Sequence, residues 1–121
     1  MHEMGLAEGI LAVALEAAAG EKVRRITLVV GNRQMVMRES LEFSFRLAAE
    51  GTPAAEAGLA VEEIPTRLHC NHCGAETEAN FPPWNCRQCG GAEVEILAGD
   101  ELLVDAVELE SGHIIRRGDT N

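Results

Sequence analysis

Residues 70–90 read CNHCGAETEANFPPWNCRQCG and contain all four cysteines of this 121-residue chain. The cysteines form two Cys-x-x-Cys pairs, and twelve residues separate one pair from the other. Each Cys-x-x-Cys turn directs two sulfur atoms toward one point, so two turns supply the four thiolates that a tetrahedral zinc ion requires. We therefore expect a structural zinc ion bound by Cys70, Cys73, Cys86 and Cys89.

The residues around the cysteines favour a metal site over disulfides. Gly74 and Gly90 each follow the second cysteine of a pair and can adopt a positive φ that closes the turn tightly. Backbone N–H groups of such a turn can donate to the thiolates. The N-terminus lacks the basic and apolar regions of a signal peptide, so we expect a cytoplasmic chain, where disulfides do not persist. Iron in a rubredoxin-like site is the main competitor of zinc, and a colourless protein would exclude it.

Size and charge limit the classes of function. The length of the chain suits one compact unit, or one unit with a small insert. Its net charge of −10 repels phosphate backbones and argues against nucleic-acid binding. The acidity suits metal cations or a basic partner, or it serves only to keep the protein in solution. No apolar run spans a bilayer, and no Gly-Lys-Ser/Thr phosphate loop or other catalytic constellation is present, so we do not expect an enzyme.

Hydrophobic periodicity predicts the elements outside the cysteine region. Helices are expected over 6–19 and 39–49, and strands over 23–30, 59–64, 94–97 and 102–110, followed by a frayed polar tail over 112–121. The expected buried positions are Leu6, Ile10, Val13, Ala14 and Ala17 in the first helix and Leu41, Phe45 and Ala48 in the second, the latter flanked by Phe43 and Leu47.

The predicted fold class is α+β, with a small mixed sheet packed with two helices and interrupted by a zinc-ribbon insert. Residues 1–65 and 94–121 form the expected body, which binds nickel as described below, and residues 66–93 form the zinc-ribbon module. Segments below about 40 residues rarely bury a sufficient core. We therefore expect metal binding to supply the folding free energy of the module.

The first three residues form a second candidate metal site. Met1 offers a free α-amine, His2 an imidazole and Glu3 a carboxylate, all within reach of one ion. With deprotonated amide nitrogens between them, the amine and the imidazole can form a planar nitrogen set, which suits Ni(II) or Cu(II) better than Zn(II). The alternative is a solvated terminal histidine, and the residues alone leave both possibilities open.

Several short segments, in order along nearly the whole chain, resemble the HypA/HybF hydrogenase nickel-incorporation family. The segments are residues 1–6 (MHEMGL), Gly31, residues 41–45 (LEFSF), Gly51 with Thr52, the two cysteine pairs, and residues 99–102 (GDEL). The sequence departs from the family pattern at Gly5, where serine is frequent, at Arg33, where an apolar residue is frequent, and at Arg87, where proline is frequent.

The resemblance implies a nickel metallochaperone that delivers Ni(II), as transient cargo, to the large subunit of [NiFe]-hydrogenase and, in some members, serves urease. It implies His2 as the essential nickel ligand, with the Met1 amine and the Glu3 region completing the site. It also implies a HypB-type GTPase and the hydrogenase large-subunit precursor as partners, and for some members a urease maturation factor. The rival functions are a zinc-ribbon module that binds nucleic acid or acts in regulation, and a small iron electron carrier. Neither a nucleic-acid nor a membrane partner is expected, and the sequence leaves monomer and dimer open.

Three further residues of the cysteine region are ambiguous. His69 and His72 flank the first cysteine pair and could join the metal site, but solvated or hydrogen-bonding roles suit them better because four thiolates already complete a tetrahedron. Trp84 either covers the zinc module or offers a docking anchor for a partner.

Overall fold

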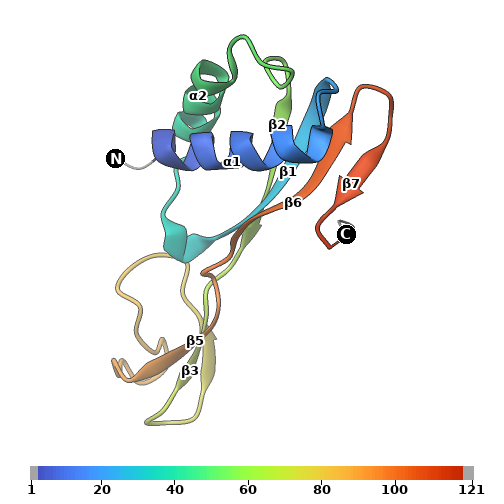
Figure 1. The fold of residues 1–121 in the computed structure, drawn as a ribbon. Helices are drawn as coiled ribbons and strands as arrows, with labels where there is room; N and C mark the ends of the chain where they lie inside the picture. Colours follow the sequence, from blue (N-terminus) through green and yellow to red (C-terminus); the bar gives the residue numbers. More distant parts are fainter. Residues whose placement is uncertain (1–2, 119–121) are drawn as a thin grey trace. The chain divides into compact units, whose positions relative to one another are not determined.

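The computed structural model describes residues 3–118 and has the expected α+β class (Figure 1). Within that range the strands form two sheets, with the orders β2-β1-β6-β7 and β4-β3-β5. The elements are α1 (Glu3–Ala18), β1 (Val23–Gly31), the short 3-10 helix η1 (Asn32–Gln34), α2 (Arg38–Ala49), β2 (Gly58–Ile64), β3 (Arg67–Cys70), β4 (Glu76–Glu78), β5 (Val94–Ala98), β6 (Leu102–Leu109) and β7 (Ile114–Arg116). No helix in the described range is long and apolar enough to cross a bilayer.

The described chain forms two compact units. The first contains residues 3–28, 36–62 and 103–118, and the second contains residues 29–35 and 63–102. The second unit thus contains the expected zinc module, together with residues on both sides of it and the segment 29–35. Compactness does not show that a segment folds alone, so the boundaries 66–93 of an independent module stay a prediction.

The core of the first unit contains the buried faces of α1 and α2, which pack against each other, and buried side chains of two strands: Val23, Ile26 and Leu28 of β1 and Val107 and Leu109 of β6. α1 buries the small side chains Ala7, Ala14 and Ala18 together with Ile10, and these positions recur at the spacing of one helix face. Alanine combines high helix propensity with a small volume, so it allows α1 to lie close to the elements that cover its buried face. The buried positions of α2 are Leu41, Ser44, Phe45 and Ala49.

The buried stripes of both helices differ in part from the prediction. Val13 is 50% exposed, and Leu6, Ala17 and Ala48 are only half-buried. Phe43 and Leu47, which flank the predicted stripe of α2, are exposed. The apolar residues of α1 occur all around the helix, so periodicity could not determine which face would be buried. The face that carries Ala7, Ala14 and Ala18 is the one that is buried.

The expectation of a frayed C-terminal tail was wrong for its first part. Ile114–Arg116 forms β7, which pairs antiparallel with β6 through the register Ala106–Arg116 and Val107–Ile115. Gly112 has a φ of +96° in the connecting turn, and its N–H donates to the Leu109 carbonyl at 2.9 Å. The glycine permits the tight turn, and the partner strand satisfies backbone groups that would otherwise face water.

The second unit contains the sheet β4-β3-β5, with both neighbours antiparallel to β3. Few side chains are buried in it: the larger ones are Val30, Leu68, Thr66 and the thiols of Cys70 and Cys86. Burying one large apolar side chain contributes about 1.5–3 kcal/mol, whereas ordering one residue costs about 1–2 kcal/mol. The apolar core is therefore too small to hold the unit together by itself.

A close backbone approach joins the two segments of the second unit. The N–H of Gly31 donates to the Glu101 carbonyl at 2.7 Å, and the N–H of Arg33 donates to the Gly99 carbonyl at 2.9 Å. A Cβ placed on Gly31 would lie 2.0 Å from that Gly99 carbonyl oxygen. Glycine at position 31 is therefore required by space rather than by an unusual φ, since its φ of −79° suits any residue.

Candidate metal centre

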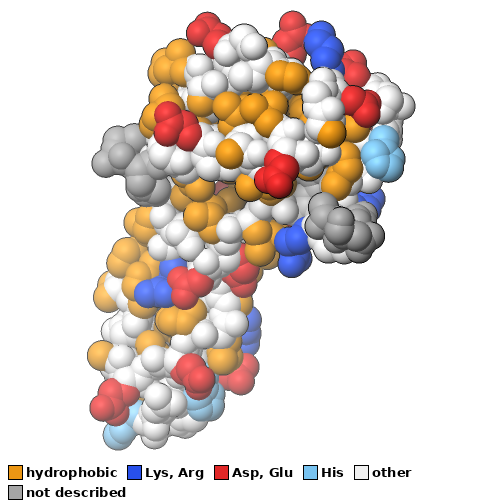
Figure 2. Space-filling view, in the orientation of Figure 1, with side chains coloured by type: hydrophobic (Ala, Val, Ile, Leu, Met, Phe, Trp, Pro, Cys, Tyr) orange, Lys and Arg blue, Asp and Glu red, His pale blue; other side chains and the backbone are white. Residues whose placement is uncertain are grey.

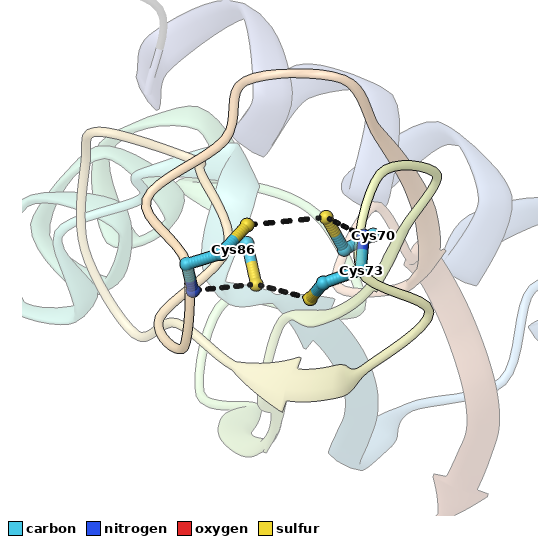
Figure 3. Close-up of side chains that lie close together, drawn as sticks. Cys70, Cys73 and Cys86 are labelled. Atoms are coloured by element: carbon cyan, nitrogen blue, oxygen red, sulfur yellow. Dashed lines mark hydrogen bonds between the residues drawn. The ribbon is translucent and has the colours of Figure 1, made fainter.

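The two cysteine turns have the same local structure (Figure 3). In the first, Gly74 has a φ of +79° and its N–H donates to the Cys70 carbonyl at 2.9 Å. In the second, Gly90 has a φ of +81° and makes the equivalent bond to the Cys86 carbonyl, also at 2.9 Å. The prediction of positive φ at both glycines is confirmed, and each turn holds its pair of sulfurs on one side.

Backbone N–H groups point at the first sulfur of each turn, as predicted. The donors are the second and third residues after that cysteine: His72 and Cys73 to the Cys70 Sγ at 3.4 and 3.3 Å, and Gln88 and Cys89 to the Cys86 Sγ at 3.4 Å each. These bonds stabilise negative charge on sulfur and fix the orientation of the ligand side chains.

The four sulfurs form a compact cluster. Cys70 and Cys89 have their sulfurs 3.6 Å apart, Cys73 and Cys86 have theirs 3.7 Å apart, and all four atoms lie within 4.8 Å of one another. With Zn–S bonds of about 2.3 Å, a tetrahedron has edges of about 3.8 Å. All four cysteines are free, so the disulfide alternative finds no support, and the donor set is suited to one tetrahedral zinc ion.

The surroundings divide the four thiols into two kinds. The N–H of Cys73 lowers the pKa of Cys70, and the N–H of Cys89 lowers the pKa of Cys86 to about 6. The N–H of Ala75 also lowers the pKa of Cys73, and the N–H of Gly91 lowers that of Cys89, but burial and the neighbouring sulfurs outweigh both contributions. The net result is a raised pKa for Cys73 and a pKa of about 12 for Cys89. The first cysteine of each turn is therefore the readier thiolate, and a metal ion must displace protons from the other two.

The two histidines of the second unit lie outside this sulfur cluster. Within residues 3–118, the potential metal ligands that lie together are the four sulfurs. His69 is half-buried in β3, opposite Glu76 of β4 and Glu95 of β5, whereas His72 is exposed and contributes its backbone N–H. This arrangement agrees with the prediction that neither His69 nor His72 is a metal ligand.

The predicted nickel residues lie mostly outside the described part of the chain. Met1 and His2 precede residue 3, where the description begins. Glu3 is described as the first residue of α1, the residue is 5% exposed, and its Oε2 accepts a hydrogen bond from the Met37 N–H at 3.4 Å. The carboxylate that the sequence offered as a metal ligand is thus turned toward the start of α2.

Sequence reasoning missed the partners of Trp84. The guanidinium of Arg33 lies over its ring, 5.8 Å from the centroid, and the Arg33 Nη1 donates to Asp100 Oδ1 at 2.6 Å. Trp84 is half-buried, and one face of its ring is covered by this cation. The pairs are separated by 51 and 67 residues in sequence, so no local pattern could have indicated them.

The arginines of the second unit are all engaged with other groups. Arg33 pairs with Asp100, Arg67 pairs with Glu76 at 3.5 Å, and Arg87 donates to the Phe81 carbonyl at 2.7 Å. Figure 2 shows basic and acidic side chains interspersed on the visible face, without a gathering of basic ones. On this face the described side chains form no continuous basic surface of the kind that the rival nucleic-acid function requires.

Comparisons with known proteins agree with the resemblance read from the sequence. The family model described as hydrogenase/urease nickel incorporation, metallochaperone, HypA matches residues 1–109. A hydrogenase maturation factor HypA of Rippkaea orientalis is 36% identical over 110 residues, covering 91% of this chain and 96% of the relative. Another, of Streptomyces avermitilis, is 40% identical over 117 residues, covering 93% and 89%.

Solved structures show the same fold. The solution structure of the Ni metallochaperone HypA from Helicobacter pylori matches with a TM-score of 0.61 and 21% identity, covering 90% of this chain and 97% of that one. A second solution structure, of a HypA protein, matches with a TM-score of 0.63 and 22% identity, covering 90% and 96%. At these identities the likeness concerns the arrangement of the chain.

Proposed function

The chain belongs to the HypA family of hydrogenase and urease nickel-incorporation metallochaperones, and on that premise we propose that it delivers Ni(II) to the large-subunit precursor of [NiFe]-hydrogenase. The observation that carries the proposal is the family match over residues 1–109, which includes both the N-terminal residues and the cysteine turns. Nickel is transient cargo in this function, zinc is a structural ion, and the protein acts in the cytoplasm as a carrier rather than as an enzyme.

The proposal assigns the two metals to different residues. Four thiolates surround an ion on all sides and hold it tightly, which suits a structural ion that stays bound. A carrier must release its cargo, so its site needs fewer anionic ligands and an open side. Met1, His2 and the start of Glu3 meet that requirement, since an amine, an imidazole and amide nitrogens favour Ni(II) over Zn(II).

The proposed partners follow from the family. A HypB-type GTPase and the hydrogenase large-subunit precursor are expected to bind this protein, and urease or a urease maturation factor is a further candidate recipient. Co-purification of the tagged full chain with each candidate, with and without Ni(II), tests these assignments one by one.

The nickel assignment is tested by replacing its central ligand. We expect His2→Ala to abolish Ni(II) binding in isothermal titration calorimetry, while zinc content and circular dichroism stay as in the unchanged protein. His113→Ala is the matched control, because it removes an exposed imidazole elsewhere in the first unit. Nickel binding by His2→Ala at the affinity of the unchanged protein would refute the proposal.

A further inference from the structure

Glu3 is the one charged residue that is buried among residues 3–118. It has no ion-pair partner among the described residues, yet a buried carboxylate must be compensated by hydrogen bonds or by opposite charge. Its described partner is the N–H of Met37, which donates to Oε2 at 3.4 Å. Met37 is the N-cap residue of α2. The burial of Glu3 thus coincides with the start of a second helix.

The start of α2 lacks a side-chain cap of its own. Met37 is extended, with φ −88° and ψ +116°, and its thioether side chain makes no capping hydrogen bond. Backbone N–H groups at a helix start need acceptors from outside the helix. The positive end of the helix dipole also favours a nearby carboxylate. Glu3 lies in the first turn of α1 and contacts the start of α2, so two helix N-termini compensate one buried negative charge.

We propose that the Glu3 carboxylate is a positioning group that ties the first residue of α1 to the start of α2, and that it is not a nickel ligand. This inference rests on the proposed nickel function, because it concerns how the ligands at residues 1 and 2 are held. The tie fixes the residue to which the two proposed ligands are attached, and a fixed attachment point lowers the entropy lost on binding an ion. The nitrogen donors of the terminus then bind Ni(II) without a carboxylate.

The two roles of Glu3 predict different results for two substitutions. Glu3→Gln keeps an acceptor oxygen and the side-chain volume but removes the anionic ligand. Glu3→Ala removes both the acceptor and the ligand. The control is Glu8→Ala, which removes an exposed carboxylate from the same helix. Each zinc-loaded variant is studied by Ni(II) titration calorimetry and, without nickel, by amide hydrogen exchange of Met37 in NMR.

A positioning role predicts that Glu3→Ala raises the Met37 exchange rate at least about threefold, as expected for losing one hydrogen bond, and weakens nickel binding by about threefold to tenfold. Glu3→Gln is expected to keep nickel affinity within about threefold of the unchanged protein and to restore slow exchange at Met37. Glu8→Ala should change neither quantity.

Two results would overturn the inference. Equal loss of nickel affinity in both Glu3 variants, without a change at Met37, would make the carboxylate a ligand. An unchanged Met37 exchange rate in Glu3→Ala would show that the tie does not exist in solution. The exchange measurement needs no nickel, so it tests the tie even if His2→Ala were to bind nickel normally and the proposed function had to be abandoned.

Discussion

Replacing Gly31 by alanine tests the close approach between the two segments of the second unit. The added Cβ would meet the Gly99 carbonyl oxygen at 2.0 Å, the Gly99 carbonyl carbon at 2.1 Å and the Asp100 nitrogen at 2.7 Å. These are backbone atoms, so no side-chain rotation can relieve the clash, and ordinary contacts of a methyl group lie at about 3.5–4.0 Å. The segments must separate by more than 1 Å, on the order of the shortfall between those distances.

The expected cost of Gly31→Ala follows from what that separation breaks. Overpacking of this kind costs about 1–3 kcal/mol. The bonds from Gly31 to Glu101 and from Arg33 to Gly99 lengthen or break, at about 0.5–1.5 kcal/mol each. We therefore expect a loss of about 2–6 kcal/mol in the free energy of unfolding of the second unit.

Trp84 is the only tryptophan of the chain and lies in the second unit, so its fluorescence during urea unfolding of the zinc-loaded protein measures this loss. Gly9→Ala is the control: it lies inside α1, where an added Cβ meets nothing within 4 Å. That variant should raise helix stability by about 0.5–1 kcal/mol, measured by far-ultraviolet circular dichroism. A change below about 0.5 kcal/mol in Gly31→Ala would show that the close approach is absent in solution.

Two further predictions concern the sulfur cluster. Cys73 has a raised pKa and Cys89 has a pKa of about 12, so both thiols are protonated at pH 7. Cys86, with a pKa of about 6, is mostly ionised at this pH, and the pKa of Cys70 is also lowered. Zinc binding should therefore release at least two protons, those of Cys73 and Cys89, and the apparent zinc affinity should fall at least about a hundredfold for each unit of pH below neutrality. Calorimetry in buffers of different ionisation enthalpy counts the protons, and a count near zero would contradict the assignment. Removal of zinc by a chelator should shift Trp84 emission to that of an exposed ring while most helical circular dichroism remains, because the helix core lies in the other unit. Simultaneous loss of both signals would mean that the two units unfold together.

Features that depend on a few neighbouring residues could be predicted from the sequence. A Cys-x-x-Cys-Gly turn contains its own geometry: the glycine adopts the positive φ, and the N–H groups that contact the first sulfur follow it within three residues. The two helices and most strands were also predicted to within a few residues, because caps, breakers and periodicity act locally. The four cysteines that the structure brings together could therefore be identified before any fold was known.

The tertiary structure decided which groups from distant parts of the chain meet. It buried Ala7, Ala14 and Ala18 of α1 while leaving Val13 exposed, and it paired β7 with β6 where a frayed tail was expected. It also turned the Glu3 carboxylate toward the N-cap of α2 and placed Arg33 over Trp84. The partners in these last two contacts are 34 and 51 residues apart. Local propensities do not predict such contacts. The free energy that favours them comes from packing and from charge compensation, and both arise only when the chain has folded.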